Sequence, residues 1–106
     1  MNESSPPGIY LIIEFDWPRP FTPEQAKMAA HLHNVVQNKR WIKEVVAASG
    51  GVGNGPSSFW TFWLENFAAL DILLKDRENE VSKAYHNFFS EMVNVHDKVR
   101  EEVEFI

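Results

Sequence analysis

The sequence contains no cysteine, so disulfides, zinc–thiolate sites and thiol nucleophiles are excluded. It has no apolar run long enough to cross a membrane as a helix. Its first residues lack the basic and apolar regions of a secretory signal, so we expect a cytoplasmic protein. Ten basic residues stand against 15 acidic ones, a net charge of −5 without a basic stripe. A general nucleic-acid surface is therefore not expected.

Apolar side chains, in contrast, are abundant for so short a chain. The 106 residues fit one domain, which we expect over residues 8–106 after a disordered, proline-rich tail over residues 1–7. Hydrophobic residues make up 44% of the sequence, with four Trp and eight Phe. A domain of this size has little interior. The composition therefore indicates more apolar surface than one core can bury, which favours a partner.

Residue periodicity predicts the secondary structure. Short β-branched and aromatic runs predict strands over residues 9–15, 41–49 and 59–65, and an alternating acidic and apolar end predicts a fourth over 100–106. Apolar steps of three and four predict main helices over 22–38 and 80–98, with a short helix over 66–76 between them. The order is β-α-β-β-α-β, typical of an α+β domain with an antiparallel sheet.

The helix starts carry capping signals. Thr22 is a capping residue, Pro23 suits the first helical position, and Gln25 completes a capping box. Asn66 is a second expected cap, at the start of the short helix.

The predicted strands are apolar on both faces. Ile9, Leu11, Ile13 and Phe15 would share one face of the first strand, while Tyr10 and Ile12 lie on the other. Phe59 and Trp63 likewise oppose Trp60 and Phe62 on the third. Helices in this order cover only one face, so we expect a second copy of the chain to cover the other in a twofold homodimer. The pattern leaves open which face meets the helices.

The stretch FWTFWLENFAALDILLKD, residues 59–76, together with the element order, resembles the dimeric α+β barrel (ferredoxin-like) superfamily, in particular an antibiotic-biosynthesis-monooxygenase-like, uncharacterised branch. The resemblance implies a ferredoxin-like sandwich that pairs into a dimeric barrel and a cleft for small molecules between sheet and helices. Heme-degrading members use an Asn on the first strand. The strand over residues 9–15 has none, so the resemblance implies no heme and we expect no cofactor.

The surplus of large apolar side chains, with histidines beside it, predicts a mainly dry cleft with a His as its polar handle. The candidate lining residues, on alternative sheet faces for the tryptophans, are His33, Trp60, Phe62, Trp63, His86 and Phe89. His31 and His33 lie two apart on a helix and point to opposite flanks, so no metal site is predicted. His96 is expected on the apolar face of the helix over 80–98.

These features allow three interpretations. The first is a protein that binds an apolar acyl or aromatic small molecule. The second is a cofactor-independent monooxygenase or isomerase of the same fold, with a His as the acid–base group, although no catalytic residue can be assigned. The third is a dimer without a pocket. The glycine-rich GGVGNG segment lacks the Lys and Ser or Thr of a phosphate-binding loop, and we interpret it as a hairpin loop.

Overall fold

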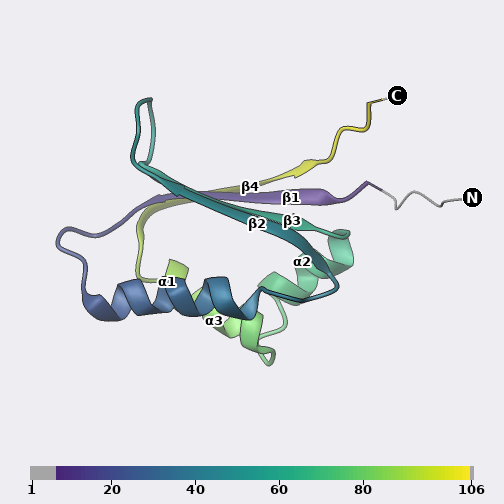
Figure 1. Ribbon diagram of the computed structural model, residues 1–106, viewed down its shortest axis with the longest axis horizontal. Coiled ribbons are helices and arrows are strands. Elements are labelled where there is room, and N and C mark those ends of the chain that lie inside the picture. Colours follow the sequence, from purple (N-terminus) through teal and green to yellow (C-terminus); the bar gives the residue numbers. More distant parts are fainter. Residues whose placement is uncertain (1–6, 106) are drawn as a thin grey trace, which may run out of the picture.

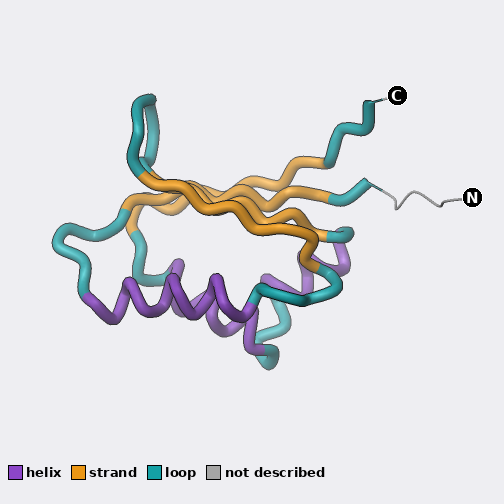
Figure 2. Tube along the Cα trace, viewed as in Figure 1, coloured by secondary structure: helices purple, strands orange, loops and turns teal. Residues whose placement is uncertain are grey.

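The structure is a computed structural model that describes residues 7–105. Most of the expected N-terminal tail, residues 1–6, and the last residue of the sequence lie outside the described part. A layer of strands lies on a layer of helices, as Figures 1 and 2 show. The elements in chain order are β1 (Ile9–Asp16), α1 (Pro23–Val35), β2 (Ile42–Ser49), β3 (Ser58–Leu64), α2 (Phe67–Leu74), α3 (Glu80–Phe89) and β4 (Val93–Glu101).

The four strands form one antiparallel sheet in the order β2-β3-β1-β4. Leu11 at the centre of β1 lies opposite Phe62 of β3 and Val99 of β4. All three helices cover the same face of this sheet (Figure 2). The arrangement is the ferredoxin-like α+β fold that the element order predicts.

The structure settles which sheet face meets the helices. Trp60 is 6% exposed and Phe62 is fully buried on the helix side. Trp63 is half-buried, and Phe59 is 36% exposed, both on the opposite, helix-free face. β1 and β3 contribute seven buried residues to the core: Ile9, Leu11, Ile13, Phe15, Trp60, Phe62 and Leu64.

The predicted end of the last helix and start of the last strand are wrong. α3 ends at Phe89, and residues 93–101 form β4 instead of continuing a helix to 98. Val93, Val95 and Val99 continue the helical spacing of the preceding aromatics, but β-branched residues at alternating positions favour a strand. Pairing with β4 satisfies the backbone N–H and C=O groups along the edge of β1 that does not pair with β3.

Because α3 ends earlier than predicted, the residues that follow it lie in a different element from the predicted one. His96 lies on β4 opposite Glu14, on the helix-free face, and is exposed; it does not lie in a helical core as expected. The predicted strand over 100–106 is wrong as well, because only its first two residues belong to β4 and residues 102–105 have no regular structure.

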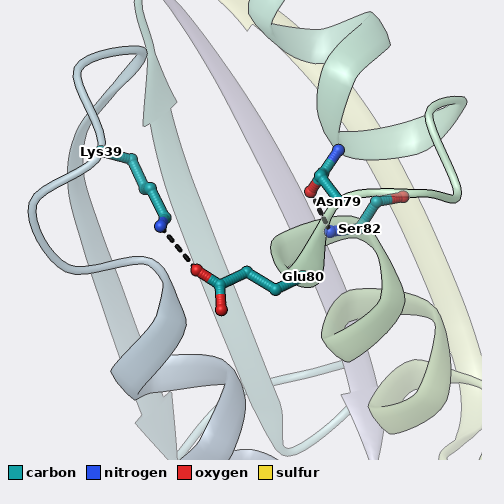
Figure 3. Close-up of polar contacts among 4 residues, drawn as sticks. All are labelled: Lys39, Asn79, Glu80 and Ser82. Carbon is teal, nitrogen blue, oxygen red and sulfur yellow. Dashed lines mark hydrogen bonds and ion pairs between the residues drawn. The ribbon is translucent and has the colours of Figure 1, made fainter.

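Polar contacts fix the helix ends. The Thr22 hydroxyl accepts from the backbone N–H of Gln25, and the Gln25 side chain accepts from the backbone N–H of Thr22, so the predicted capping box is confirmed. Asn79 caps α3 by accepting from the N–H of Ser82 at 2.8 Å (Figure 3). The adjacent Glu80 pairs with Lys39 after α1 at 2.7 Å.

The capping box supports a stability prediction. Thr22→Ala should lower the free energy of unfolding by about 0.5–2 kcal/mol, because the N–H of Gln25 loses its acceptor. Urea denaturation followed by circular dichroism measures the change. Thr22→Ser keeps the hydroxyl and is the control; an unchanged midpoint for Thr22→Ala would contradict the prediction.

Candidate functional site

A cavity of about 220 Å³ opens on the helix side of the sheet, at the end of β2 and β3 nearest their hairpin. Its walls include Phe15, Trp17, Ala47, Ser49, Ser58 and Trp60. In the sheet register Ala47 lies opposite Trp60, and Ser49 lies opposite Ser58. β2 therefore places small side chains where β1 and β3 carry aromatic ones, and the space beside Trp60 is left unfilled.

Packing fixes the Trp60 indole. Its ring centroid lies 5.9 Å from Phe62, 5.7 Å from Phe88 and 6.0 Å from Phe89. Phe15, at the back of the cavity, packs edge-on against Phe89 at 5.3 Å. Offset and edge-to-face contacts at these distances are favourable for aromatic rings. The cavity therefore has a preformed aromatic wall.

The two hydroxyl side chains of this cavity pair with each other. Ser58 is 2% exposed, and its hydroxyl lies 2.9 Å from the hydroxyl of Ser49. No titratable side chain belongs to the described lining. An apolar group entering the cavity would therefore leave these two hydroxyls paired with each other.

Of the six residues predicted for the site, only Trp60 lines this cavity. Trp60, Phe62 and Phe89 pack on the helix side, and the exposed His33 of α1 approaches Trp60 edge-on, with ring centroids 6.5 Å apart. His86 lies farther along α3, where its Nε2 is 2.9 Å from the carbonyl oxygen of Leu74. The sequence analysis did not identify the small residues at the end of β2 as part of a cavity wall. The run AAS after two valines was the available sign that this strand ends in small side chains.

Trp63, the remaining predicted residue, lies on the helix-free face. It stacks on Tyr10 with ring centroids 5.8 Å apart, and the Lys43 ammonium lies 5.0 Å from its ring centroid. The indole N–H donates to Glu102 Oε1 at 3.1 Å, and the same oxygen accepts from the backbone N–H of Gly8 at 2.7 Å. These two bonds, that from Gly8 foremost, lower the pKa of Glu102.

A wider groove, of about 1120 Å³, lies beyond the end of the sheet. The loop over residues 17–22 and the hairpin over residues 50–57 border it, and the hairpin rises on the helix-free side of the sheet (Figure 1). Trp17 and Ser49 line both this groove and the cavity. The two hollows are therefore adjacent, with the Trp17 side chain between them.

Asp16 joins three segments at the groove. Its Oδ1 accepts from the backbone N–H of Ser57 at 2.8 Å and from the Ser57 hydroxyl at 3.0 Å. Its Oδ2 accepts from the side-chain amide of Asn94 at 3.0 Å. These hydrogen bonds, with the backbone bond from Ser57 first, lower the pKa of Asp16. The carboxylate thus ties the end of β1 to the hairpin and to the start of β4.

Two further findings concern residues 7–105. No three or more His, Asp or Glu side chains in this range group closely enough to hold a metal ion. No helix in it has the length and apolar character needed to cross a membrane.

The fold is similar to several solved structures. A hydroxynitrile lyase from Passiflora edulis matches with a TM-score of 0.71 at 14% identity, over 95% of this chain and 99% of that one. A hypothetical protein from Arabidopsis thaliana gives 0.68 at 10% identity, over 98% and 96%. A dimeric ferredoxin-like protein of unknown function from Thermobifida fusca gives 0.61 at 16% identity, over 92% of each chain. At these identities the likeness establishes the fold. No family model and no curated protein matches the sequence.

Asp16 supports a pH-dependent prediction. Because its pKa in the folded protein lies below the usual 3.8, the charged carboxylate stabilises the fold above that value, and the contribution is lost as pH falls through the lower, folded pKa. Asp16→Asn should therefore lower the melting temperature at about pH 7, and the gap to wild type should narrow toward about pH 3. Differential scanning fluorimetry across this range measures both.

Asp71→Asn is the matched control, because it removes a carboxylate that makes only an exposed pair with Lys75, at 3.4 Å on α2. Equal melting temperatures for wild type and Asp16→Asn at neutral pH would contradict a role for Asp16 in joining the three segments.

Proposed function

We propose that this protein binds an apolar small molecule, an acyl or aromatic compound, in the cavity beside Trp60. The observation that carries the proposal is the aromatic wall left open by Ala47 and Ser49 at the end of β2. Ligand sites are mostly apolar hollows with few polar groups, and this lining has that character. At about 220 Å³ the cavity suits a small ring or the end of a longer chain.

Binding is favoured over catalysis by the chemistry of the lining. A monooxygenase or isomerase without a cofactor needs an acid–base group beside its substrate. The described lining offers only the paired Ser49 and Ser58 hydroxyls. The nearby Tyr85 is 4% exposed, and burial, followed by the negative charge of Asp97, raises its pKa above the usual value. The phenol of Tyr85 therefore stays neutral at physiological pH. The hydroxynitrile lyase is similar to this chain in fold alone, so it does not favour catalysis over binding here.

We also propose that a second copy of the chain covers the helix-free face, as in the dimeric α+β barrel superfamily. This face carries a patch that crosses β2, β3 and β1, composed of Tyr10, Ile12, Val46, Phe59, Thr61 and Trp63. The β4 edge is polar, with His96, Lys98 and Arg100 opposite β1. An apolar patch with a charged rim on one side is the usual anatomy of a protein interface. The Thermobifida fusca neighbour of the same fold is described as dimeric.

The cavity proposal predicts a fluorescence response. Titration with 1-octanol or 2-phenylethanol should change the intrinsic tryptophan emission, because the ligand replaces water beside Trp60. Trp63→Phe, on the opposite sheet face, should keep this change in full. Trp60→Phe should lose the larger part of it and leave only the contribution of Trp17 at the cavity wall.

A filling variant provides the test of the location. Ala47→Leu places a larger side chain into the cavity from an exposed edge strand and should weaken octanol binding severalfold in calorimetry. Val46→Leu, one residue earlier on the helix-free face, is the matched control and should bind as wild type. Equal binding by both variants, or no binding of either alcohol to wild type, would rule out the cavity as the ligand site.

The dimer proposal predicts a mass of about twice 12.2 kDa in size-exclusion chromatography with light scattering. Thr61→Lys introduces a charge at the centre of the proposed interface and should shift the protein toward the monomer mass. Ala30→Lys, at an exposed position on α1, should leave the mass unchanged. A wild-type protein that runs as a monomer at micromolar concentration would contradict the proposal.

A further inference from the structure

The groove beyond the sheet continues the cavity. Both are lined by Trp17 and Ser49, and the groove has about 1120 Å³ against about 220 Å³ for the cavity. A compound whose apolar end lies against Trp60 and whose length exceeds the cavity therefore extends past Trp17 into the groove. The side chains of the groove then determine which chemical group can bind at the other end of the ligand.

Most polar groups of the groove are already engaged with each other. Asp16 accepts hydrogen bonds from Ser57 and Asn94 at 2.8–3.0 Å. Ser49 shares a hydrogen bond with Ser58 at 2.9 Å. A ligand that took any of these partners would break an existing bond to make a new one, with little net gain.

Arg19 is the exception among the charged, hydroxyl and amide side chains that line the groove. Within residues 7–105 its guanidinium makes no ion pair within 4.0 Å and no hydrogen bond, although it lies near enough to Asp16 to help lower the pKa of that carboxyl. A guanidinium has five N–H donors in a planar fork that matches a carboxylate. The available polar group of the groove is therefore cationic and suited to a carboxylate.

Apolar side chains line the same groove as this cation. Trp17 packs against Phe21 with ring centroids 5.0 Å apart, and Phe21 remains 56% exposed. Val93, which also lines the groove, is 43% exposed. Pro18 and Pro20 flank Arg19 and restrict the backbone of the loop that carries it. The loop thus presents a cation beside exposed apolar surface, which matches an amphipathic acid.

We propose that the ligand is a monocarboxylic acid with an apolar chain or ring, that its apolar end occupies the cavity beside Trp60, and that Arg19 binds its carboxylate in the groove. This inference rests on the proposed binding function and specifies its substrate class. Arg19 is then the residue that distinguishes acids from neutral compounds of the same length.

Calorimetry with two probes of equal chain length tests the inference. Wild type should bind octanoate more tightly than 1-octanol. Arg19→Met, which keeps an apolar stem of similar length, should weaken octanoate by about tenfold, the scale of one charged hydrogen-bonded contact, and should leave octanol unchanged. Arg19→Lys should retain part of the octanoate affinity, since it keeps the charge without the fork.

Arg40→Met is the matched control, because it removes an exposed arginine that is not part of the groove. It should bind both probes as wild type. Added salt should weaken octanoate binding to wild type and have a smaller effect on Arg19→Met. Circular dichroism of each variant verifies that the fold is intact.

The outcomes separate the two proposals. If wild type binds octanol and octanoate, but Arg19→Met and Arg19→Lys bind octanoate as tightly as wild type, the carboxylate assignment is wrong and the cavity proposal stands. If wild type binds neither probe, the cavity proposal fails and the assignment fails with it.

Discussion

The structure depends on one constraint: both faces of the four-stranded sheet carry apolar side chains, but the helices cover only one face. On the helix side, burial of Leu11, Ile13 and Phe62 removes large apolar surfaces from water, worth about 1.5–3 kcal/mol for each side chain before entropy is counted. Within residues 7–105 no helix covers the other face. The fold therefore has a core that one chain completes and a second apolar surface that it does not complete.

The constraint also explains where the cavity lies. An edge strand contributes less to the core than the central strands do, so it tolerates small side chains at the end nearest the hairpin. Ala47 and Ser49 occupy that end of β2, beside the wall formed by Trp60. Larger residues at these two positions would close the space without altering the sheet register. The cavity is thus a local property of two small side chains on a scaffold held elsewhere.

The sequence predicted the elements whose signals are local. Alternating β-branched and aromatic residues identified the first three strands, and Thr22 with Gln25 identified the start of α1. It failed at the join of α3 and β4, because valines spaced for a helix also suit a strand, and only pairing with β1 decides between the two. Which sheet face meets the helices also lay beyond the sequence, since both carry aromatics.

The candidate site was only partly predictable for a related reason. Large aromatic residues are conspicuous in the sequence, but of those predicted only Trp60 lines the cavity. Phe62 and Phe89 pack against Trp60 without lining the cavity, and Trp63 lies on the opposite face of the sheet. The space itself arises from small residues, and a small residue carries no signal of what lies opposite it. Arg19 was missed because its role depends on which neighbouring polar groups are already bonded, and this requires coordinates.

At the end of the sheet where the groove lies, loop residues form the surface and do not build the core. The core is held by strands and helices, whereas the groove is formed by the loop over 17–22, the hairpin over 50–57 and the start of β4. Asp16, which directly precedes this loop, joins the end of β1 to the hairpin and to the start of β4 through three hydrogen bonds. This end of the sheet therefore has a defined geometry without large buried surfaces. A side chain such as Arg19 can therefore change the chemistry of the groove while the core stays intact. The recognition that we propose at this end is separable from folding, as is usual where loops on a rigid scaffold carry a binding site.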